Sequence, residues 1–158
     1  MAAVYEKPSE ALAELFDKVK ESTSIPHWVE FELLINNKLK DVYKIVKLND
    51  LIGALTEGMN FVVVVNEEII EQLPVELQEI LLVESLAGVF ISESDAISLE
   101  KPNFSTFTGV LQKYGHDKII MMKESVKSLY DAVKQKEDEE KAQKKAKRAE
   151  RAAKKAAK

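Results

Sequence analysis

Few side chains in this sequence could do chemistry, and the clearest candidate is Glu84. It stands in residues 77–91, a segment that is otherwise mostly aliphatic. At the helical spacing of about 100° per residue, Glu84 falls beside apolar positions. These positions are Leu77, Ile80, Ala87, Gly88 and Ile91. A carboxylate among aliphatic side chains is costly unless it is paired or protonated, so Glu84 calls for a functional hypothesis.

One known motif that carries a glutamate on a helix is the HExxH zinc site, and it can be compared with this segment. In that motif two histidines at i and i+4 bind Zn²⁺ on one helix face, and the glutamate is the general base. Here the aligned residues 83–87 read Val-Glu-Ser-Leu-Ala. Val83 and Ala87 stand at the histidine positions and cannot bind metal. The chain's two histidines, His27 and His116, are too far apart to replace an i, i+4 pair. We predict no metal site, no cofactor and no catalysis, with Glu84 a vestigial residue.

Three roles remain open for Glu84 itself. The first is structural, with the carboxylate bonded to a strand backbone or paired with a lysine, because buried charges are normally paired. The second is a binding role in a vestigial cleft. The third is catalysis without metal, which lacks a partner acid, base or nucleophile in the sequence.

The second candidate for function is the charge pattern at the C-terminal end. Residues 141–158 hold nine Lys or Arg and one acid, for a net charge of +8, and residues 137–140 are all acidic. The preceding 136 residues carry −8. A basic arm beside an acidic body is typical of a protein that contacts a polyanion. We therefore expect non-specific binding of nucleic acid, most simply DNA, through nine cations. These are Lys141, Lys144, Lys145, Lys147, Arg148, Arg151, Lys154, Lys155 and Lys158.

The composition of this basic segment limits how it could bind. Residues 131–158 hold no aromatic side chain, so the segment offers no base stacking. Its apolar residues are only alanines, which argues against a membrane-bound amphipathic helix. We interpret the cations as facing all sides of the helix, which favours a diffuse charge over groove readout. Two alternatives stay open: a solubilising extension, free or folded back onto acidic residues, and a contact with an anionic protein.

The elements that must position these residues follow from periodicity. An amphipathic helix is predicted over residues 10–21, with Ser9 as its N-cap. Residues 29–35 and 40–48 alternate as strands and are expected to pair as a hairpin or meander. A short helix over residues 51–56, capped by Asn49 or Asp50, precedes the β-branched run 61–65, which predicts a strand buried on both faces.

The second half of the chain is expected to be helical. After Pro74, a central helix is predicted over residues 75–91, with Gln78, Ser85 and Ser92 on a separate polar face. Another helix follows from Phe104, capped by Asn103 and closed by Gly115. The last begins near His116 with a heptad seam that is better explained by packing on the domain than by a coiled coil. The seam consists of Ile119, Met122, Val126, Leu129 and Val133.

These elements predict an α+β fold: a small, mostly antiparallel sheet of about three strands, packed against a central buried helix and flanking helices, with a long C-terminal helix. We divide the chain into a domain over residues 1–135 and a charged tail over 136–158, helical or disordered. The chain has no cysteine, and its first residues lack the features of a signal peptide. No apolar run is long enough to span a bilayer. We expect a cytoplasmic protein.

Several of these segments resemble a known family. Residues 60–68, Leu73-Pro74, residues 77–89 and the later residues 101–115 are similar to the phage metallopeptidase family, which has a zincin-like fold. The family's acidic motif is replaced here by Pro102-Asn103, and its two histidines are lost. The resemblance implies a degenerate, phage-encoded pseudoenzyme in the host cytoplasm. We expect it to be a nucleic-acid-binding accessory protein, alternatively a protein-interaction or host-inhibitory protein, and least of all a residual hydrolase.

Overall fold

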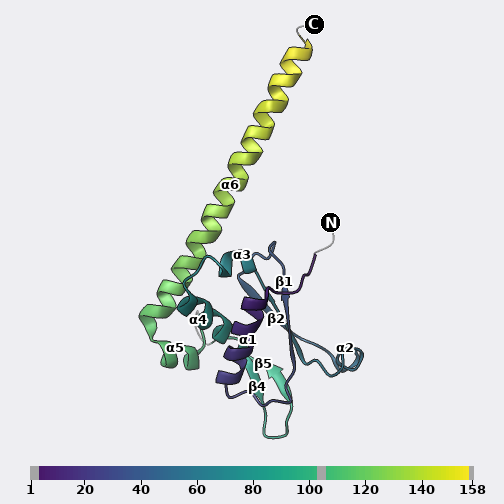
Figure 1. The fold of residues 1–158 in the computed structure, drawn as a ribbon, viewed down its shortest axis with the longest axis vertical. Helices are drawn as coiled ribbons and strands as arrows, with labels where there is room; N and C mark the ends of the chain where they lie inside the picture. The colour runs from purple at the N-terminus through teal and green to yellow at the C-terminus, as the bar shows by residue number, and fades with distance from the viewer. Residues whose placement is uncertain (1–3, 103–105, 157–158) are drawn as a thin grey trace. The chain divides into compact units, whose positions relative to one another are not determined.

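A three-stranded mixed sheet forms the centre of the fold (Figure 1). The computed structural model describes residues 4–102 and 106–156, with side chains described through residue 149. The strand order is β1-β3-β2, where β1 is Phe31–Ile35, β2 is Tyr43–Lys47 and β3 is Phe61–Val65. β1 runs parallel to β3, and β2 runs antiparallel to it. Together with the helices, this sheet confirms the predicted α+β class.

The predicted pairing of the first two strands is wrong, because β3 lies between them. The burial of the strands gives the physical reason. In β3, Phe61, Val63 and Val65 are fully buried, so this apolar strand takes the central position with a neighbour on each side. β2 is an edge strand in which Lys44 and Lys47 are exposed. A second, antiparallel pair of strands, β4 (Val89–Ile91) and β5 (Ile97–Leu99), forms a separate sheet.

The helices in the first half begin where local caps predict. α1 (Glu10–Ser22) starts after Ser9, whose side chain accepts from the Leu12 amide, and buries Leu12, Phe16 and Val19. α2 (Asp50–Leu55) is capped by Asn49 in the same way. α3 (Glu67–Ile70) is capped by Asn66. Each of these caps satisfies an amide that the first helical turn leaves without a backbone partner.

The central helix α4 (Val75–Leu86) is shorter than predicted and ends before residue 91. Residues 89–91 form β4 instead, because they pair with residues 97–99. Gly88 permits the close approach of the two segments, since a Cβ there would lie 2.9 Å from the Glu100 carbonyl oxygen. The predicted polar face is also wrong at Ser85, which is buried and donates to the Leu82 carbonyl. α4 is therefore enclosed almost all round, and α1 packs against it.

The last two helices are α5 (Thr108–Tyr114) and α6 (His116–Ala156). α5 begins after Phe107, so the predicted start at Phe104 is too early; the predicted cap, Asn103, lies outside the described residues. Gly115 closes α5 with a φ of 82°. At the start of the predicted seam, Ile119 and Met122 are buried in the core, whereas Val133 is exposed.

The chain divides into two compact units, residues 1–126 and 127–158. The second unit is helical through Ala156, and its side chains from residue 131 to 149 are all exposed. It therefore has no core of its own. Among the described residues, no helix combines the length and the apolar character needed to cross a membrane.

Candidate nucleic-acid interface and the surroundings of Glu84

Glu84 is buried in the last turn of α4, with 2% of its surface exposed. This confirms its predicted position among apolar side chains. Its carboxylate accepts a hydrogen bond from the Lys123 ammonium of α6 at 2.9 Å. The Lys123 side chain is 37% exposed, so the ammonium reaches the buried carboxylate from the surface. Of the three roles considered for Glu84, the structure agrees with the structural one, in which the carboxylate pairs with a lysine.

The Glu84 charge also acts on Tyr43, at the start of β2. Burial raises the pKa of the Tyr43 phenol above its usual value, and the carboxylates of Glu84 and Asp41 raise it further. Tyr43 therefore keeps its proton over the whole neutral range. The arrangement around Glu84 is one carboxylate, one ammonium and one neutral phenol, with no nucleophile paired to a base.

The positions that zinc ligands would occupy hold no metal-binding group. Val83 is buried, and Ala87 is the C-cap of α4. His27 and His116 are both exposed and belong to different parts of the first unit. In the described part of the chain, no three His, Cys, Asp or Glu side chains lie close enough to hold a metal ion.

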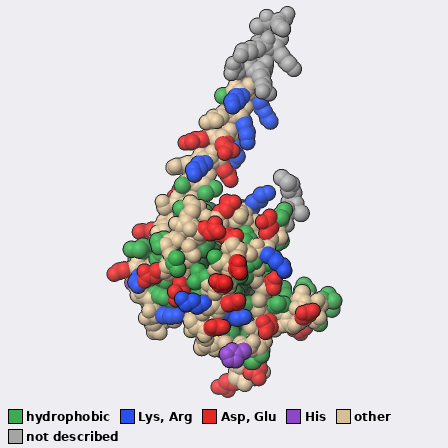
Figure 2. Space-filling model, in the orientation of Figure 1, with side chains coloured by type: hydrophobic (Ala, Val, Ile, Leu, Met, Phe, Trp, Pro, Cys, Tyr) green, Lys and Arg blue, Asp and Glu red, His purple; other side chains and the backbone are tan. Residues whose placement is uncertain are grey.

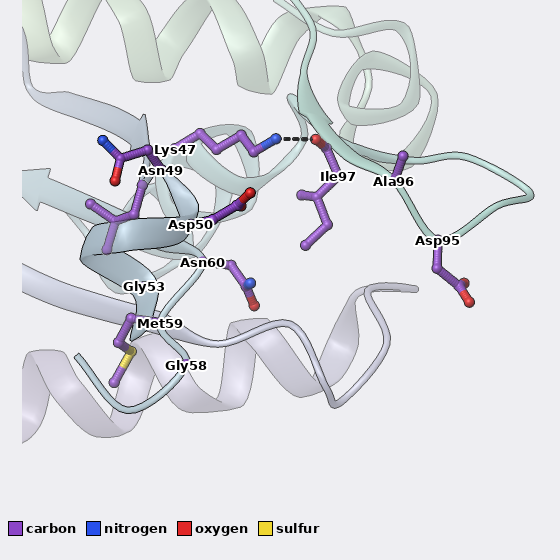
Figure 3. Close-up of a pocket in the computed structure, with 11 residues that line it drawn as sticks. Lys47, Asn49, Asp50, Gly53, Gly58, Met59, Asn60, Asp95, Ala96 and Ile97 are labelled. Carbon is purple, nitrogen blue, oxygen red and sulfur yellow. Dashed lines mark hydrogen bonds between the residues drawn. The ribbon is translucent and has the colours of Figure 1, made fainter. Parts of the chain in front are cut away.

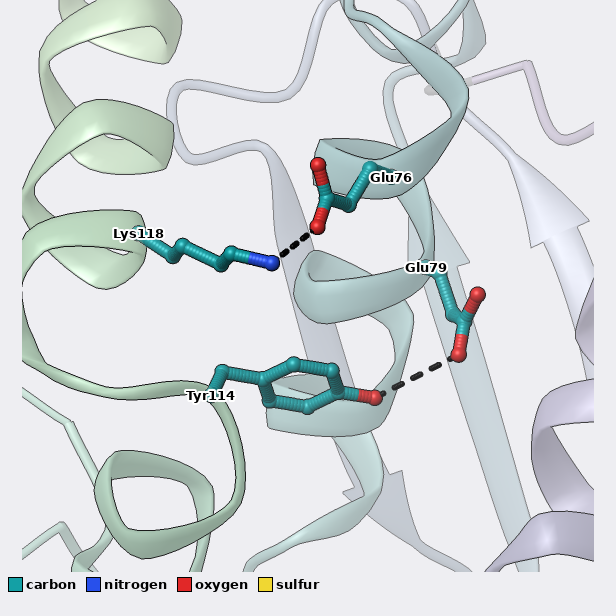
Figure 4. Close-up of polar contacts among 4 residues, drawn as sticks. All are labelled: Glu76, Glu79, Tyr114 and Lys118. Carbon is teal, nitrogen blue, oxygen red and sulfur yellow. Dashed lines mark hydrogen bonds and ion pairs between the residues drawn. The ribbon is translucent and has the colours of Figure 1, made fainter.

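Two further contacts join α4 to the end of α5 and to the first turn of α6 (Figure 4). The Tyr114 hydroxyl donates to Glu79 at 3.5 Å, and Lys118 forms an ion pair with Glu76. Both partners of the Lys118 pair are largely exposed, so this contact contributes little to stability. The Glu84–Lys123 pair differs because the Glu84 carboxylate is almost completely shielded from solvent.

The described cations of the tail lie on one side of α6, contrary to the interpretation that they face all sides. At roughly 100° per residue, Lys141, Lys144, Lys145, Lys147 and Arg148 fall within an arc of about 160°. We call these five residues the basic face. Ala142, Ala146 and Ala149 lie on the other side. Arg151, Lys154 and Lys155 belong to the same helix, with side chains outside the description, and Lys158 lies outside the described residues.

The acidic residues before the basic face pair with its first members. Lys141 lies 3.6 Å from Glu137 and 3.9 Å from Asp138, and Lys144 lies 3.8 Å from Glu140. Within the described tail, Lys145, Lys147 and Arg148 have no ion-pair partner. Figure 2 shows Lys and Arg side chains (blue) interspersed with acidic ones (red) along this helix. The cations of the basic face are exposed, so they are available to a polyanion.

Two cavities were not predicted from the sequence. The first, of about 460 Å³, lies between α2 and the β4–β5 turn, where the Lys47 side chain donates to the Ile97 carbonyl (Figure 3). Its walls come from residues 47–60 and 95–97. The second, of about 440 Å³, lies between α5 and the first turns of α6 and includes Lys123. No local sequence pattern predicts either cavity, because the lining residues come from separate segments that meet only in the folded chain.

Comparisons of the chain with protein-family models, curated proteins and solved structures find no match.

Proposed function

We propose that this chain is a non-catalytic, phage-encoded accessory protein that binds nucleic acid through the basic face of α6. The observation that carries the proposal is the one-sided arrangement of five exposed cations, three of them without an ion-pair partner in the described tail. Such a surface can neutralise several phosphates of one nucleic-acid backbone and release their counterions. DNA in the host cytoplasm is the simplest polyanion for it.

The charge distribution supports nucleic-acid binding by the tail alone. The 136 residues before the acidic block carry −8 and would repel a phosphate backbone. Figure 2 shows acidic side chains spread over the visible face of residues 1–126. The first unit therefore supplies no competing basic surface in this view, and affinity is expected to come from electrostatics alone.

Three observations support the absence of catalysis. Apolar residues stand at both histidine positions, Glu84 is tied to Lys123, and no described cluster of His, Cys, Asp or Glu could hold a metal. Together with the resemblance to the phage metallopeptidase family, they support the proposal that α4 is a zincin-like helix without zinc chemistry. Metal analysis of the purified protein tests this: one tightly held zinc per chain would contradict the proposal.

The binding test is an anisotropy titration of labelled duplex DNA at several salt concentrations. The basic-face variant carries Lys144→Gln, Lys145→Gln, Lys147→Gln and Arg148→Gln. Each lost phosphate contact reduces the slope of log affinity against log salt by about 0.9, so the slope should fall by up to roughly 3.6. Deletion of residues 137–158 should abolish salt-dependent binding.

A matched control separates charge from helix structure. Ala142→Gln, Ala146→Gln and Ala149→Gln change the opposite side of α6 without changing its charge, and glutamine is a good helix former. This control should bind as the wild type does. Equal weakening by both variants, or no salt-dependent binding by the wild type, would remove the nucleic-acid function.

One observation favours protein interaction as a second candidate function. Leu51 and Leu55 on α2 are exposed, and this helix has no buried residue. Exposed apolar groups that cluster on one element often mark a protein contact. A Leu51→Ser, Leu55→Ser variant should lose a host partner that the wild type captures, with the solution mass measured to exclude self-association. Capture unaffected by the variant would count against this candidate.

A further inference from the structure

The groove between α5 and α6 has the size and the lining of a small-molecule site. It encloses about 440 Å³, within the range of about 300–1,000 Å³ that is usual for ligand pockets. Its apolar wall is formed by Leu111 of α5 with Ile119 and Ile120 of α6. We call this cavity the α5–α6 groove. Such a wall favours a hydrocarbon chain over a strongly hydrated ligand.

Thr106 adds an unused polar group to this wall. Its side chain is 4% exposed, and its Oγ1 has no hydrogen-bond partner within the described structure. A buried hydroxyl that makes no hydrogen bond costs about 1–3 kcal/mol, so proteins rarely retain one without a reason. Its Oγ1 exposes less than 1 Å² to solvent, so a ligand in the groove does not reach this hydroxyl unless the side chain moves.

Lys123 adds a second donor. An ammonium has three N–H donors, and the Glu84 carboxylate accepts one of them at 2.9 Å. The side chain is partly exposed and lines the groove. The ammonium can therefore donate to a ligand while it stays paired with Glu84. His116 and Glu124 complete the polar part of the lining.

The charges around the groove select the kind of ligand. An anionic ligand would meet the Glu124 carboxylate, and the Lys123 ammonium of the lining is already paired with Glu84. A cationic ligand could approach Glu124, but it would be repelled by the Lys123 ammonium and has no acceptor to offer it. An uncharged acceptor avoids both penalties, because it adds a hydrogen bond without adding net charge.

We propose that the α5–α6 groove binds an uncharged, mainly apolar small molecule that carries one hydrogen-bond acceptor. The acceptor bonds to the Lys123 ammonium, and the hydrocarbon chain lies against Ile119 and Ile120. This site lies within residues 1–126 and does not depend on nucleic-acid binding by the tail. It uses the lysine paired with Glu84 for recognition and involves no reaction.

The experiment titrates the full chain with three probes of equal chain length and follows backbone amide signals by NMR. Octanamide has the neutral acceptor, octanoate is anionic and octylammonium is cationic. We expect octanamide to shift signals of groove residues in a saturable way, and both charged probes to bind about tenfold more weakly or not at all. Absence of octanamide binding, or octanoate binding as tightly, would overturn the proposal.

Variants locate the site without breaking the Glu84–Lys123 pair. Ile120→Glu places a charge on the apolar wall at a side chain that is 40% exposed, so the fold should survive. Met121→Glu is the matched control, because Met121 is the next residue, is 58% exposed and does not line the groove. Octanamide affinity should fall at least about tenfold in the first variant and stay unchanged in the second. Equal effects would assign the binding to another surface.

Thr106→Val removes the hydroxyl while keeping the side-chain shape. The free protein should be as stable as the wild type or slightly more so, because an unsatisfied buried group is lost. Octanamide affinity should stay unchanged in this variant, because the Thr106 hydroxyl oxygen is closed off from the groove. Unchanged affinity in Ile120→Glu would refute the site.

Discussion

The Lys123 ammonium of α6 lies 2.9 Å from the buried carboxylate of Glu84 in α4, a contact between residues 39 positions apart in the sequence. Lys123 supplies a positive charge beside this buried carboxylate. The pair lets an acidic side chain remain on an apolar helix face, and it fastens the start of α6 to the central helix.

Removal of Lys123 should therefore destabilise the first unit. Lys123→Met keeps the length of the apolar stem but leaves Glu84 buried and unpaired. We expect the free energy of unfolding to fall by about 2–4 kcal/mol, somewhat less than for a fully buried pair because the ammonium is partly exposed. Urea unfolding followed by far-ultraviolet circular dichroism measures the change. Lys118→Met, at the exposed pair with Glu76, is the control and should cost less than about 1 kcal/mol. Equal costs would mean that Glu84 does not need its partner.

Tyr43 should make stability depend on alkaline pH. Its pKa in the folded protein is raised above the usual value of about 10, by burial first and then by the Glu84 and Asp41 carboxylates. The folded state therefore keeps a proton that the unfolded state loses near pH 10. This contribution is complete below about pH 10 and is lost as the pH rises toward the folded pKa, so the free energy of unfolding falls with pH in that window.

The phenolate absorbance and the pH dependence of unfolding test this relationship together. Tyr43→Phe should flatten the decline in stability above about pH 10. Glu84→Gln should let Tyr43 ionise at lower pH, because one of the carboxylates that raise its pKa is gone. Tyr5→Phe removes a hydroxyl from an exposed side chain and is the control. An alkaline decline that persists unchanged in Tyr43→Phe would contradict the assignment.

Gly88 should be intolerant of any side chain. A Cβ at this position would lie 2.9 Å from the Glu100 carbonyl oxygen and 3.1 Å from Cζ of Phe107. The Glu100 carbonyl oxygen belongs to the backbone and cannot move without disturbing the surrounding structure. Gly88→Ala should therefore lower the free energy of unfolding by about 1–3 kcal/mol. A Cβ at Gly109 in α5 would meet no atom within 4 Å beyond its own helix backbone, and Gly109→Ala should be neutral or stabilise by about 0.5 kcal/mol. Thermal unfolding of the two variants decides whether this close approach ends α4.

The parts of the fold that were predicted from the sequence are those set by local interactions. Ser9 and Asn49 cap the helices that follow them, since a side-chain oxygen and the amide three residues later are neighbours in any helix start. The burial of Glu84 followed from helical spacing alone. Gly115 closes α5 for a different local reason, since glycine readily adopts the positive φ, here 82°, that ends the helix.

The predictions of strand pairing and of the end of α4 were wrong because contacts between segments distant in sequence determine these features. β1 and β2 are consecutive in sequence, but β3 separates them because its buried valines need a neighbour on each side. Residues 89–91 fit the hydrophobic pattern of a helix as well as that of a strand. Their pairing with residues 97–99 selects the strand. Lys123 had no sequence signal as the partner of Glu84, since only the packing of α6 on α4 brings the two together.

The acidic block of residues 137–140 should weaken the polyanion contacts that we propose for the basic face. Glu137 and Asp138 lie near Lys141, and Glu140 lies near Lys144, so these acids compete with phosphates for the first two cations. Neutralising all four acids to their amides should raise duplex DNA affinity about tenfold at low salt, because several weak pairs and their repulsion of phosphate are removed together. The gain should shrink as salt is raised, since these charges are exposed and screened. Circular dichroism controls for helix content. Affinity that stays the same at low salt, in a wild type that does bind DNA, would show that the acids do not oppose binding; a wild type that does not bind would instead remove the tail function itself.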